Sequence, residues 1–426
     1  MKRSWLALIT VLTVGLLLSS RAWGSDWPRF RGPNGAGIAA DKDVPVQWTE
    51  ANVLWKTAIP GQGNSSPIVW GNHVFLQSAD ASGKERYLIC LGANDGKILW
   101  TRAVPSSKAY IHSLNTWASS TPATDGHHVY ALFWDGSTVA LYAFDFQGNQ
   151  IWKHDLGGFT SQHGPGASPI VHEGKVFFLF DQDNDYWLTP SSKLVALDAK
   201  SGKTAWEVQR KAFRACYSTP FILDDPARGP ELIVASTAGI AGYQPHTGKE
   251  NWNWTWHFDR MALRTVASPI FGQGLIFANS GDGSGERNAV AVRPGKNSGS
   301  DSPHLVWENK KILPYVPSML AWEDHVFAVN DKGLALCYLA QTGKPIWNEH
   351  LANGFSASPV LIDGKVYAAS EDGEVFVFPA ASSFKLLAKN SIGEKVRATP
   401  AVANNRLMIR GQQHLFCIGQ KGLSTE

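Results

Sequence analysis

The chain has 426 residues, of which 44% are hydrophobic, with 39 Lys and Arg against 36 Asp and Glu. Lys2, Arg3 and Arg21 lie within the first 24 residues, which contain no acid; setting these three aside leaves 36 basic against 36 acidic side chains. This balance gives no sign of the basic face that nucleic-acid binding requires. The length exceeds one ordinary hydrophobic core, so two domains or a repeat array are expected.

Residues 1–24 are predicted to be a secretory signal peptide. Lys2 and Arg3 precede an apolar run from Trp5 to Leu18, and Ala22-Trp23-Gly24 has the small-x-small pattern of a cleavage site. The run is shorter than the roughly 20 residues that span a membrane, and no Cys follows it for a lipid anchor. We therefore expect a periplasmic or secreted protein without a transmembrane anchor after cleavage, and a monomer.

A Ser/Thr-Pro pair that recurs along the chain identifies a repeat array. One degenerate copy, Ser318-Met319, fills the long gap after Pro269. Eight copies result, each followed by an apolar stretch, a turn and a Val/Ile-aromatic strand. The seven intact pairs are Ser66-Pro67, Thr121-Pro122, Ser168-Pro169, Thr219-Pro220, Ser268-Pro269, Ser358-Pro359 and Thr399-Pro400.

Most copies end with a Gly four residues before a Trp. The Gly supplies the positive φ that a short hairpin needs, and the Trp has enough surface to cover the contact with a neighbouring sheet. Four short strands cannot bury both faces of a sheet, whereas sheets packed around a ring can. The sequence therefore predicts an all-β, eight-bladed β-propeller of four-stranded antiparallel blades. The pairs are Gly96/Trp100, Gly148/Trp152, Gly202/Trp206, Gly248/Trp252 and Gly343/Trp347, and Trp307 ends a copy with a lengthened turn.

The two ends of the repeat region predict how the ring closes. The eighth copy stops without a Trp strand, and such a strand occurs around Trp55 at the other end. The N-terminal strand is therefore expected to complete the last blade. The seventh copy also lacks its Trp, and 384–387 is expected to substitute. The predicted regions are the extension 25–47, which either wraps the propeller or stays mobile, the propeller 48–420 and the tail 421–426.

The stretch Ala199-Lys200-Ser201-Gly202-Lys203-Thr204-Ala205-Trp206 resembles the tryptophan-docking repeat of PQQ-type propellers. This superfamily includes the quinoprotein alcohol dehydrogenases and the BamB-type outer-membrane assembly propellers. The opening Asp26-Trp27-Pro28-Arg29-Phe30-Arg31-Gly32-Pro33-Asn34-Gly35 is similar to the lead-in of secreted PQQ-binding-like repeat proteins. The resemblance implies the fold, and fold does not determine function.

The resemblance also implies what quinone chemistry would need: an adjacent Cys–Cys disulfide, a Ca²⁺ held by Glu and Asn, and an Asp as base. The adjacent pair is absent from the sequence. Cys90, Cys337 and Cys417 share one repeat position that elsewhere holds Ala, Gly or Val, which favours a packing role. A bridge between Cys90 and Cys417 stays open in an oxidising compartment, and Cys216 is expected to be free.

Two acidic clusters are candidate metal sites. Asp181, Asp183 and Asp185 alternate around Asn184 and could give Ca²⁺ oxygen ligands, but the loop lacks the Gly and distal Glu of a helix–loop–helix site. Asp282 to Asn288 is a Gly-rich charged turn of the same kind. A solvated loop is favoured for the first and a structural turn for the second, so no metal is predicted.

Side chains that vary between copies lie just ahead of each Ser/Thr-Pro pair. Because the following strand is innermost in a blade, these residues should line the mouth of the central channel, where loops commonly carry function. Arg suits carboxylate or phosphate, so an anionic or carbohydrate-like ligand is expected there. The predicted binding residues are Trp117, His163, Arg214, Tyr217, Arg264, Tyr315, Lys395 and Arg397, with Asn64, Thr116, Asn353 and Phe355 at equivalent positions.

Three functions remain open from the sequence. The favoured one is an exported, non-catalytic binding or assembly scaffold that acts through its channel-mouth loops on a protein partner or a ligand. The alternative is a PQQ- and Ca²⁺-dependent quinoprotein oxidoreductase, with Trp117 stacking on the cofactor. A hydrolase or lyase is disfavoured because no paired carboxylates recur at equivalent positions. A WD40-type propeller is a rival fold, but its Gly-His and Trp-Asp signature does not recur.

Overall fold

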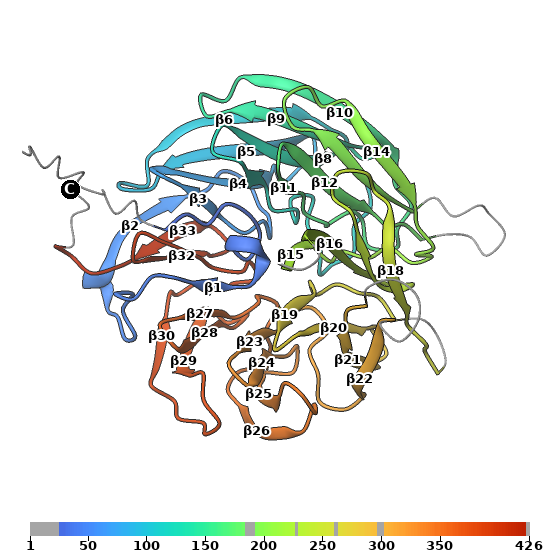
Figure 1. Ribbon diagram of the computed structural model, residues 1–426. Coiled ribbons are helices and arrows are strands. Elements are labelled where there is room, and N and C mark those ends of the chain that lie inside the picture. The colour runs from blue at the N-terminus through green and yellow to red at the C-terminus, as the bar shows by residue number, and fades with distance from the viewer. Residues whose placement is uncertain (1–24, 184–191, 226–228, 260–262, 296–301, 423–426) are drawn as a thin grey trace, which may run out of the picture.

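The computed structural model describes residues 25–183, 192–225, 229–259, 263–295 and 302–422. Within these ranges the chain forms eight antiparallel sheets arranged around a central channel, which confirms the predicted all-β, eight-bladed propeller (Figure 1). Two short 3-10 helices, η1 (Pro33–Gly35) and η2 (Glu50–Asn52), precede the first blade. No helix in these ranges is long and apolar enough to cross a membrane. The predicted signal peptide lies outside the described residues.

Blades 1 to 7 are each built on a meander of four consecutive strands, numbered from the channel outwards. The short strands end at Gly-, Asn- and Asp-containing turns, as their β-branched and aromatic composition favours. Blades 1 to 4 consist of β3 (Ile68–Trp70), β4 (His73–Ala79), β5 (Glu85–Gly92), β6 (Ile98–Pro105); β7 (Ala123–Thr124), β8 (His128–Trp134), β9 (Thr138–Asp145), β10 (Gln150–Gly158); β11 (Ile170–His172), β12 (Lys175–Phe180), β13 (Lys193–Asp198), β14 (Thr204–Gln209); β15 (Phe221–Asp225), β16 (Gly229–Ser236), β17 (Gly239–Tyr243) and β18 (Glu250–Thr255).

The second half of the ring repeats this plan and closes on the N-terminal part of the chain. Blade 7 carries an additional parallel strand, β1 (Ile38–Ala39), beside its innermost strand, and blade 8 takes its outermost strand, β2 (Val53–Ala58), from the start of the chain. The predicted ring closure through Trp55 is therefore confirmed. Blades 5 to 8 contain β19 (Ile270–Gly272), β20 (Leu275–Gly281), β21 (Arg287–Arg293), β22 (His304–Asn309); β23 (Leu320–Trp322), β24 (His325–Val329), β25 (Leu334–Leu339), β26 (Pro345–His350); β27 (Val360–Ile362), β28 (Lys365–Ala369), β29 (Glu374–Pro379), β30 (Ala388–Ser391); β31 (Ala401–Ala403), β32 (Arg406–Arg410) and β33 (His414–Ile418).

The Trp near the end of a blade docks onto the next blade. Trp152 is typical: its indole N–H donates to the Ala199 carbonyl of blade 3 at 2.9 Å. Gly202 of that blade has φ +67°, and a Cβ placed there would lie 2.5 Å from the Trp152 ring. The recurring Gly–Trp spacing therefore has a second reason, because the Gly of one blade receives the Trp of the preceding blade. The same bond joins Trp55 to Ala93, Trp100 to Phe146, Trp206 to Pro245, Trp307 to Ala340 and Trp347 to Ala381.

The cysteine position of the repeat lies directly across from this Trp. Cys90 pairs with Trp100 and Cys417 with Trp55 in the strand register. A small side chain is required there: at the equivalent Gly242, a Cβ would approach the indole of Trp252 to 2.5 Å. Cys90 and Cys417 are both free and fully buried, so the packing interpretation holds and the bridge is absent.

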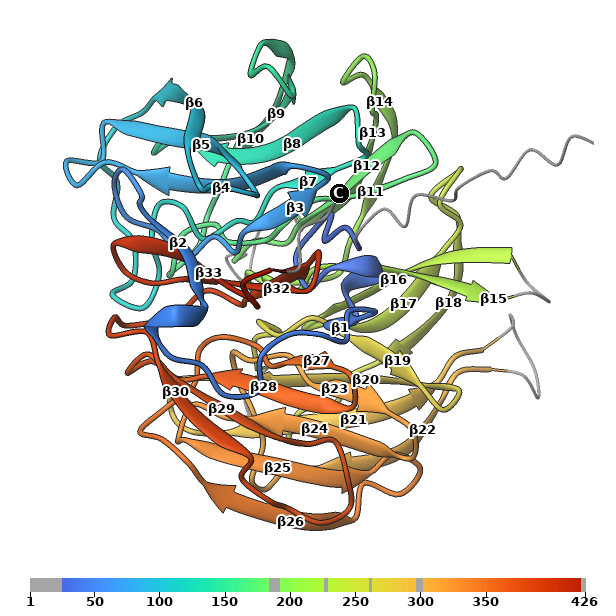
Figure 2. The same ribbon diagram turned by 90° about the vertical axis from the view of Figure 1, so that its left-hand side faces the viewer.

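The seam between blades 7 and 8 lacks a docking Trp and is covered by the N-terminal extension. Phe384 does not fill this place, because it packs against Trp347 of blade 6 with ring centroids 5.2 Å apart. Instead, the Asn390 side chain of blade 7 donates to the Val46 carbonyl of the extension and accepts the backbone N–H of Trp48, a buried residue directly after the extension. Figure 2 shows the chain between β1 and β2 running along the strands of these two blades. The extension is therefore an ordered part of the fold.

The start of the extension crosses one end of the channel. We call residues 27–37 the plug segment; its helix η1 lies over the centre of the ring in Figure 1. Its side chains and backbone bond to the inner strands of five blades. These bonds join Trp27 to Val69, Pro28 to Thr124, Arg29 to Pro220, Asn34 to Ile222, Arg31 to Ser318 and Met319, and Gly37 to Leu361.

Candidate functional site

A cavity of about 540 Å³ occupies the channel on the side of the loops that precede the inner strands. Phe30 of the plug segment lines it, so the plug segment contributes to its floor. The structure brings six of the eight predicted binding residues to this cavity, together with Asn64: His163, Arg214, Tyr217, Arg264, Tyr315 and Arg397.

The other nominated residues lie outside the cavity lining. Trp117 donates its indole N–H to the Ala109 carbonyl at 3.0 Å, and its ring covers the guanidinium of Arg86 at 5.1 Å. Lys395 is exposed and is not part of the lining. Phe355 is fully buried in the core, and Asn353 bonds to Asp372. The loop that leads from the outermost strand of one blade to the innermost strand of the next differs in length among blades. Residues at the same distance before the Pro therefore need not point their side chains in the same direction.

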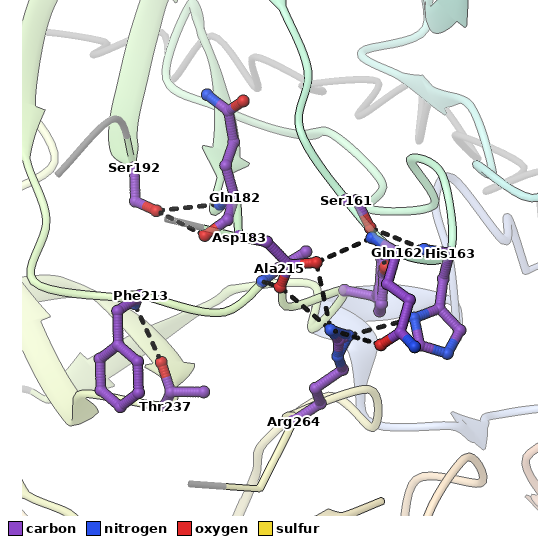
Figure 3. A network of polar contacts seen from close by, with 11 residues as sticks. Ser161, Gln162, His163, Gln182, Asp183, Ser192, Phe213, Ala215, Thr237 and Arg264 are labelled. Atoms are coloured by element: carbon purple, nitrogen blue, oxygen red, sulfur yellow. Dashed lines mark hydrogen bonds and ion pairs between the residues drawn. The ribbon is translucent and has the colours of Figure 1, made fainter. Parts of the chain in front are cut away.

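Asp183 organises one side of the mouth, as Figure 3 shows. Its carboxylate accepts bonds from Arg264 Nη2 at 3.0 and 3.1 Å and from the backbone N–H groups of Gln162 and Ala215. The Arg264 side chain is only 3% exposed. Three successive pre-strand loops therefore meet at one carboxylate, and Arg264 acts mainly as the cation that fixes it.

Arg264 also determines the state of His163. Its Nη1 lies 3.1 Å from Nδ1 of His163, and because a guanidinium only donates, Nδ1 must accept. Burial, the positive charge of Arg264 and the neighbouring His112 lower the pKa of His163 to about 4. The imidazole is therefore neutral near pH 7 and carries its proton on Nε2, as a hydrogen-bond donor.

Two tyrosines give the cavity aromatic walls. The hydroxyl of Tyr217 lies 2.8 Å from that of Ser161, and burial raises its pKa. Tyr315 packs beneath the guanidinium of Arg287 at 4.9 Å, and burial raises its pKa as well. Both phenols stay protonated at neutral pH. Arg397, across the mouth, pairs with Glu371 at 3.5 Å.

The Ser/Thr of each repeat pair forms a hydrogen-bonded belt around the channel. For six of the eight neighbouring pairs in the described chain, the backbone N–H of one belt residue donates to the side-chain hydroxyl of the next, at 2.9–3.0 Å; the hydroxyls of Thr219 and Ser66 receive no such bond from Ser168 and Thr399. This explains the signature, because the hydroxyl ties neighbouring blades and the Pro needs no N–H partner. Seven belt residues also line the cavity: Ser66, Thr121, Ser168, Thr219, Ser318, Ser358 and Thr399. The recurring hydroxyls were visible in the sequence, but their cyclic arrangement requires the ring.

The described acidic side chains of the two candidate calcium clusters are bonded to protein groups. Asp181, fully buried, forms an ion pair with Arg210 at 2.8 Å, and Asp183 is held by Arg264. Asp185 and Asn184 lie outside the described residues. Asp282 accepts bonds from the backbone and hydroxyl of Ser284 within its own turn. Among the residues placed by the structure, no group of three or more His, Cys, Asp or Glu side chains could hold a metal ion.

The residues that the sequence offered for a quinone cofactor and its Ca²⁺ make other contacts. Trp117, nominated as the stacking platform, is occupied by Arg86 outside the cavity. Asp183 and Glu371 are paired with Arg264 and Arg397, and Asp282, which lines the cavity, accepts bonds from Ser284.

Comparison with known proteins agrees with this architecture. The family model described as outer membrane protein assembly factor BamB matches residues 38–142, 81–214, 140–302 and 304–383. The chain is 24% identical over 302 residues to BamB of Bordetella pertussis, covering 67% of this chain and 66% of that protein. It is 30% identical over 269 residues to a polyvinylalcohol dehydrogenase of a Pseudomonas species, covering 54% of this chain and 39% of the relative. The matches thus span less than two thirds of these relatives.

Solved structures show the same fold at low sequence identity. BamB of Moraxella catarrhalis superposes with a TM-score of 0.62 at 16% identity, covering 87% of this chain and 98% of that one. The quinohemoprotein alcohol dehydrogenase of Comamonas testosteroni gives 0.64 at 12% identity, covering 94% and 81%. At such identities the likeness shows the fold alone.

Proposed function

The chain belongs to the family described as outer membrane protein assembly factor BamB, and we propose that it is a non-catalytic binding or assembly propeller. In this proposal it works in the cell envelope, as a monomer, and holds a ligand or a segment of a partner protein at the mouth of its channel. The observation that carries the proposal is the cavity of about 540 Å³, lined by different polar and aromatic side chains from successive blades.

The arrangement of the mouth supports binding rather than chemistry. Asp183 and Arg264 are paired with each other, His163 is a fixed neutral donor, and the tyrosines stay protonated. A general base near neutral pH needs a pKa near the working pH and a free proton acceptor. The described groups instead form preorganised donors and aromatic walls, which suit recognition.

Site-specific photocross-linking in cells tests this proposal. Leu114 lines the cavity and is 62% exposed, whereas Leu99 on the outer strand β6 is 51% exposed and lies away from it. A photoreactive amino acid at 114 is expected to give a discrete adduct, and the same residue at 99 is the matched control. Equal adducts from both positions, or none from 114, would contradict the proposal.

The alternative is a quinoprotein oxidoreductase, favoured by the similarity to a polyvinylalcohol dehydrogenase. Purified protein mixed with PQQ and Ca²⁺ is expected to retain no chromophore after gel filtration and to show no dye-linked oxidation of alcohols. A retained chromophore together with dye reduction would replace the binding proposal with the oxidoreductase.

A further inference from the structure

The belt hydroxyls offer a set of protons to the channel. Each bonded hydroxyl oxygen accepts a backbone N–H from the neighbouring blade, which leaves its own O–H free to donate. Among the residues that the structure describes, no acceptor is bonded to the O–H of any of the seven belt residues in the lining. The cavity wall therefore presents hydroxyl donors whose hydrogen bonds a ligand could accept.

Two belt hydroxyls are free both to donate and to accept a hydrogen bond. The side-chain oxygens of Ser66 and Thr219 have no hydrogen-bond partner within the described part of the chain, although both residues are only 2% exposed and line the cavity. They differ in this from Thr121, whose hydroxyl receives the N–H of Ser66. Neither oxygen is among the fully buried unpartnered atoms, so each hydroxyl is accessible from the cavity and can donate to an acceptor bound there.

Buried positive charge surrounds the same belt. Arg29, Arg31 and Arg410 donate only to backbone carbonyls, at Pro220, at Gly35, Ala36, Ser318 and Met319, and at Ser65 and Gln77, respectively. Each guanidinium thus lies at or beside a belt residue of blade 4, 6 or 1. In the described ranges none has a carboxylate partner, and burial lowers the pKa of each to about 9.

These cations differ from the other buried arginines of the channel. Arg210 and Arg264 are compensated by Asp181 and Asp183. Uncompensated buried charge is costly unless a counter-charge lies nearby. Within the described cavity lining, the carboxylate available to balance the three positive charges at the belt is that of Asp282.

We propose that the belt is a seat for an oxyanion, a carboxylate or a phosphate, which accepts bonds from the hydroxyls of Ser66, Thr219 and their neighbours in the field of the three buried guanidiniums. The inference rests on the proposed function and names its ligand class. It also places the anion deeper in the cavity than the sequence predicted, because Arg264 at the mouth is already paired with Asp183. The plug segment crosses the other end, so the ligand enters from the mouth as a small anion or as the end of a chain.

Isothermal titration of the full chain in low-salt Tris with inorganic phosphate, acetate and glucose tests the charge requirement. Phosphate or acetate is expected to bind, and glucose is not. Two peptides of one sequence, ending in a free carboxylate or a carboxamide, distinguish a chain end from a free ion: tighter binding of the acid form than of acetate identifies a partner's C-terminus. Glucose binding with no anion binding would overturn the proposal, as would no binding at all.

Variants locate the seat. Ser66→Ala and Thr219→Val each remove a cavity hydroxyl that makes no belt bond, and each is expected to weaken anion binding about tenfold, the loss of one hydrogen bond to a charged acceptor. Ser120→Ala is the control, because that hydroxyl is likewise unpartnered but is buried outside the cavity lining. Unchanged binding in both belt variants, or an equal loss in Ser120→Ala, would refute the seat. Adducts at residue 114 without anion binding refute this inference alone; absent adducts refute the proposed function.

Discussion

Replacing Gly202 with Ala tests whether the Trp–Gly contact joins the blades. The new Cβ would lie 2.5 Å from the Trp152 ring, a distance that real Cβ atoms do not reach, so the indole must move. Gly174 provides a matched control: its φ is +71° against +67° at Gly202, and nothing lies within 4 Å of its Cβ position. Both substitutions therefore carry the same backbone strain, about 1–2 kcal/mol, and only one carries the clash.

The additional cost at Gly202 follows from what Trp152 loses. Overpacking costs about 1–3 kcal/mol, and the bond to Ala199 contributes about 1 kcal/mol. We expect the free energy of unfolding of Gly202→Ala to be about 2–4 kcal/mol lower than that of Gly174→Ala. For a chain of this size, 1 kcal/mol corresponds to about 1 °C in Tm, so the Tm difference should be about 2–4 °C.

Thermal unfolding followed by circular dichroism and calorimetry measures this difference. The test is completed in a Trp152→Ala background, where the clash is gone and Gly202→Ala should cost no more than Gly174→Ala. Equal Tm values for the two glycine variants in the wild-type background would refute the docking explanation. So would an unchanged difference once Trp152 is removed.

Three further predictions concern a buried pair, a titrating group and the seam. Asp181→Asn leaves Arg210 buried and uncompensated and should lower the free energy of unfolding by about 3–5 kcal/mol. Asp155→Asn, which breaks the exposed ion pair with Lys153, should lower it by less than about 1 kcal/mol. Similar losses for the two variants in chemical denaturation would contradict this. The pKa of His163 lies at about 4, below its ordinary 6.5, so folding favours the neutral ring: its stabilisation is full above pH 6.5 and is lost as the pH falls towards 4. His163→Asn should remove that part of the pH dependence of stability, and an NMR titration with a midpoint near 6.5 would show the reasoning wrong. Trp48→Ala should lower the free energy of unfolding by about 3–5 kcal/mol, and the control Leu386→Ala, at an exposed position, by less than about 0.5 kcal/mol. Equal effects of the two variants on Tm would mean that the chain around Trp48 does not stabilise the seam between blades 7 and 8.

The repeat made most of the fold predictable from the sequence. Ser/Thr-Pro pairs and the Gly–Trp spacing locate every blade because each feature serves a contact repeated around the ring. The strand at Trp55 was identifiable for the same reason, since the last copy lacked it. The extension carries no such period, and its bonds, such as Arg29 to Pro220, join residues 191 positions apart, so no local pattern could indicate its course.

The candidate site was predictable in place but not in its internal partners. Counting back from each Pro brought six of eight nominated residues to the cavity. It failed for Trp117, whose loop turns the ring onto Arg86. It also could not pair Arg264 with Asp183, because the two lie 81 positions apart and meet only when the loops of blades 3, 4 and 5 converge.

The plug segment and β2 also impose an order on assembly. Residues 27–58 come before every blade that they contact, yet their partners extend to Leu361 and Ile418. Contacts of such sequence separation require the intervening chain to be organised first, and they are slow to form because a long loop must close. The segment that emerges early in synthesis is therefore expected to take its place late, after the inner strands of blades 4, 6 and 7 have formed.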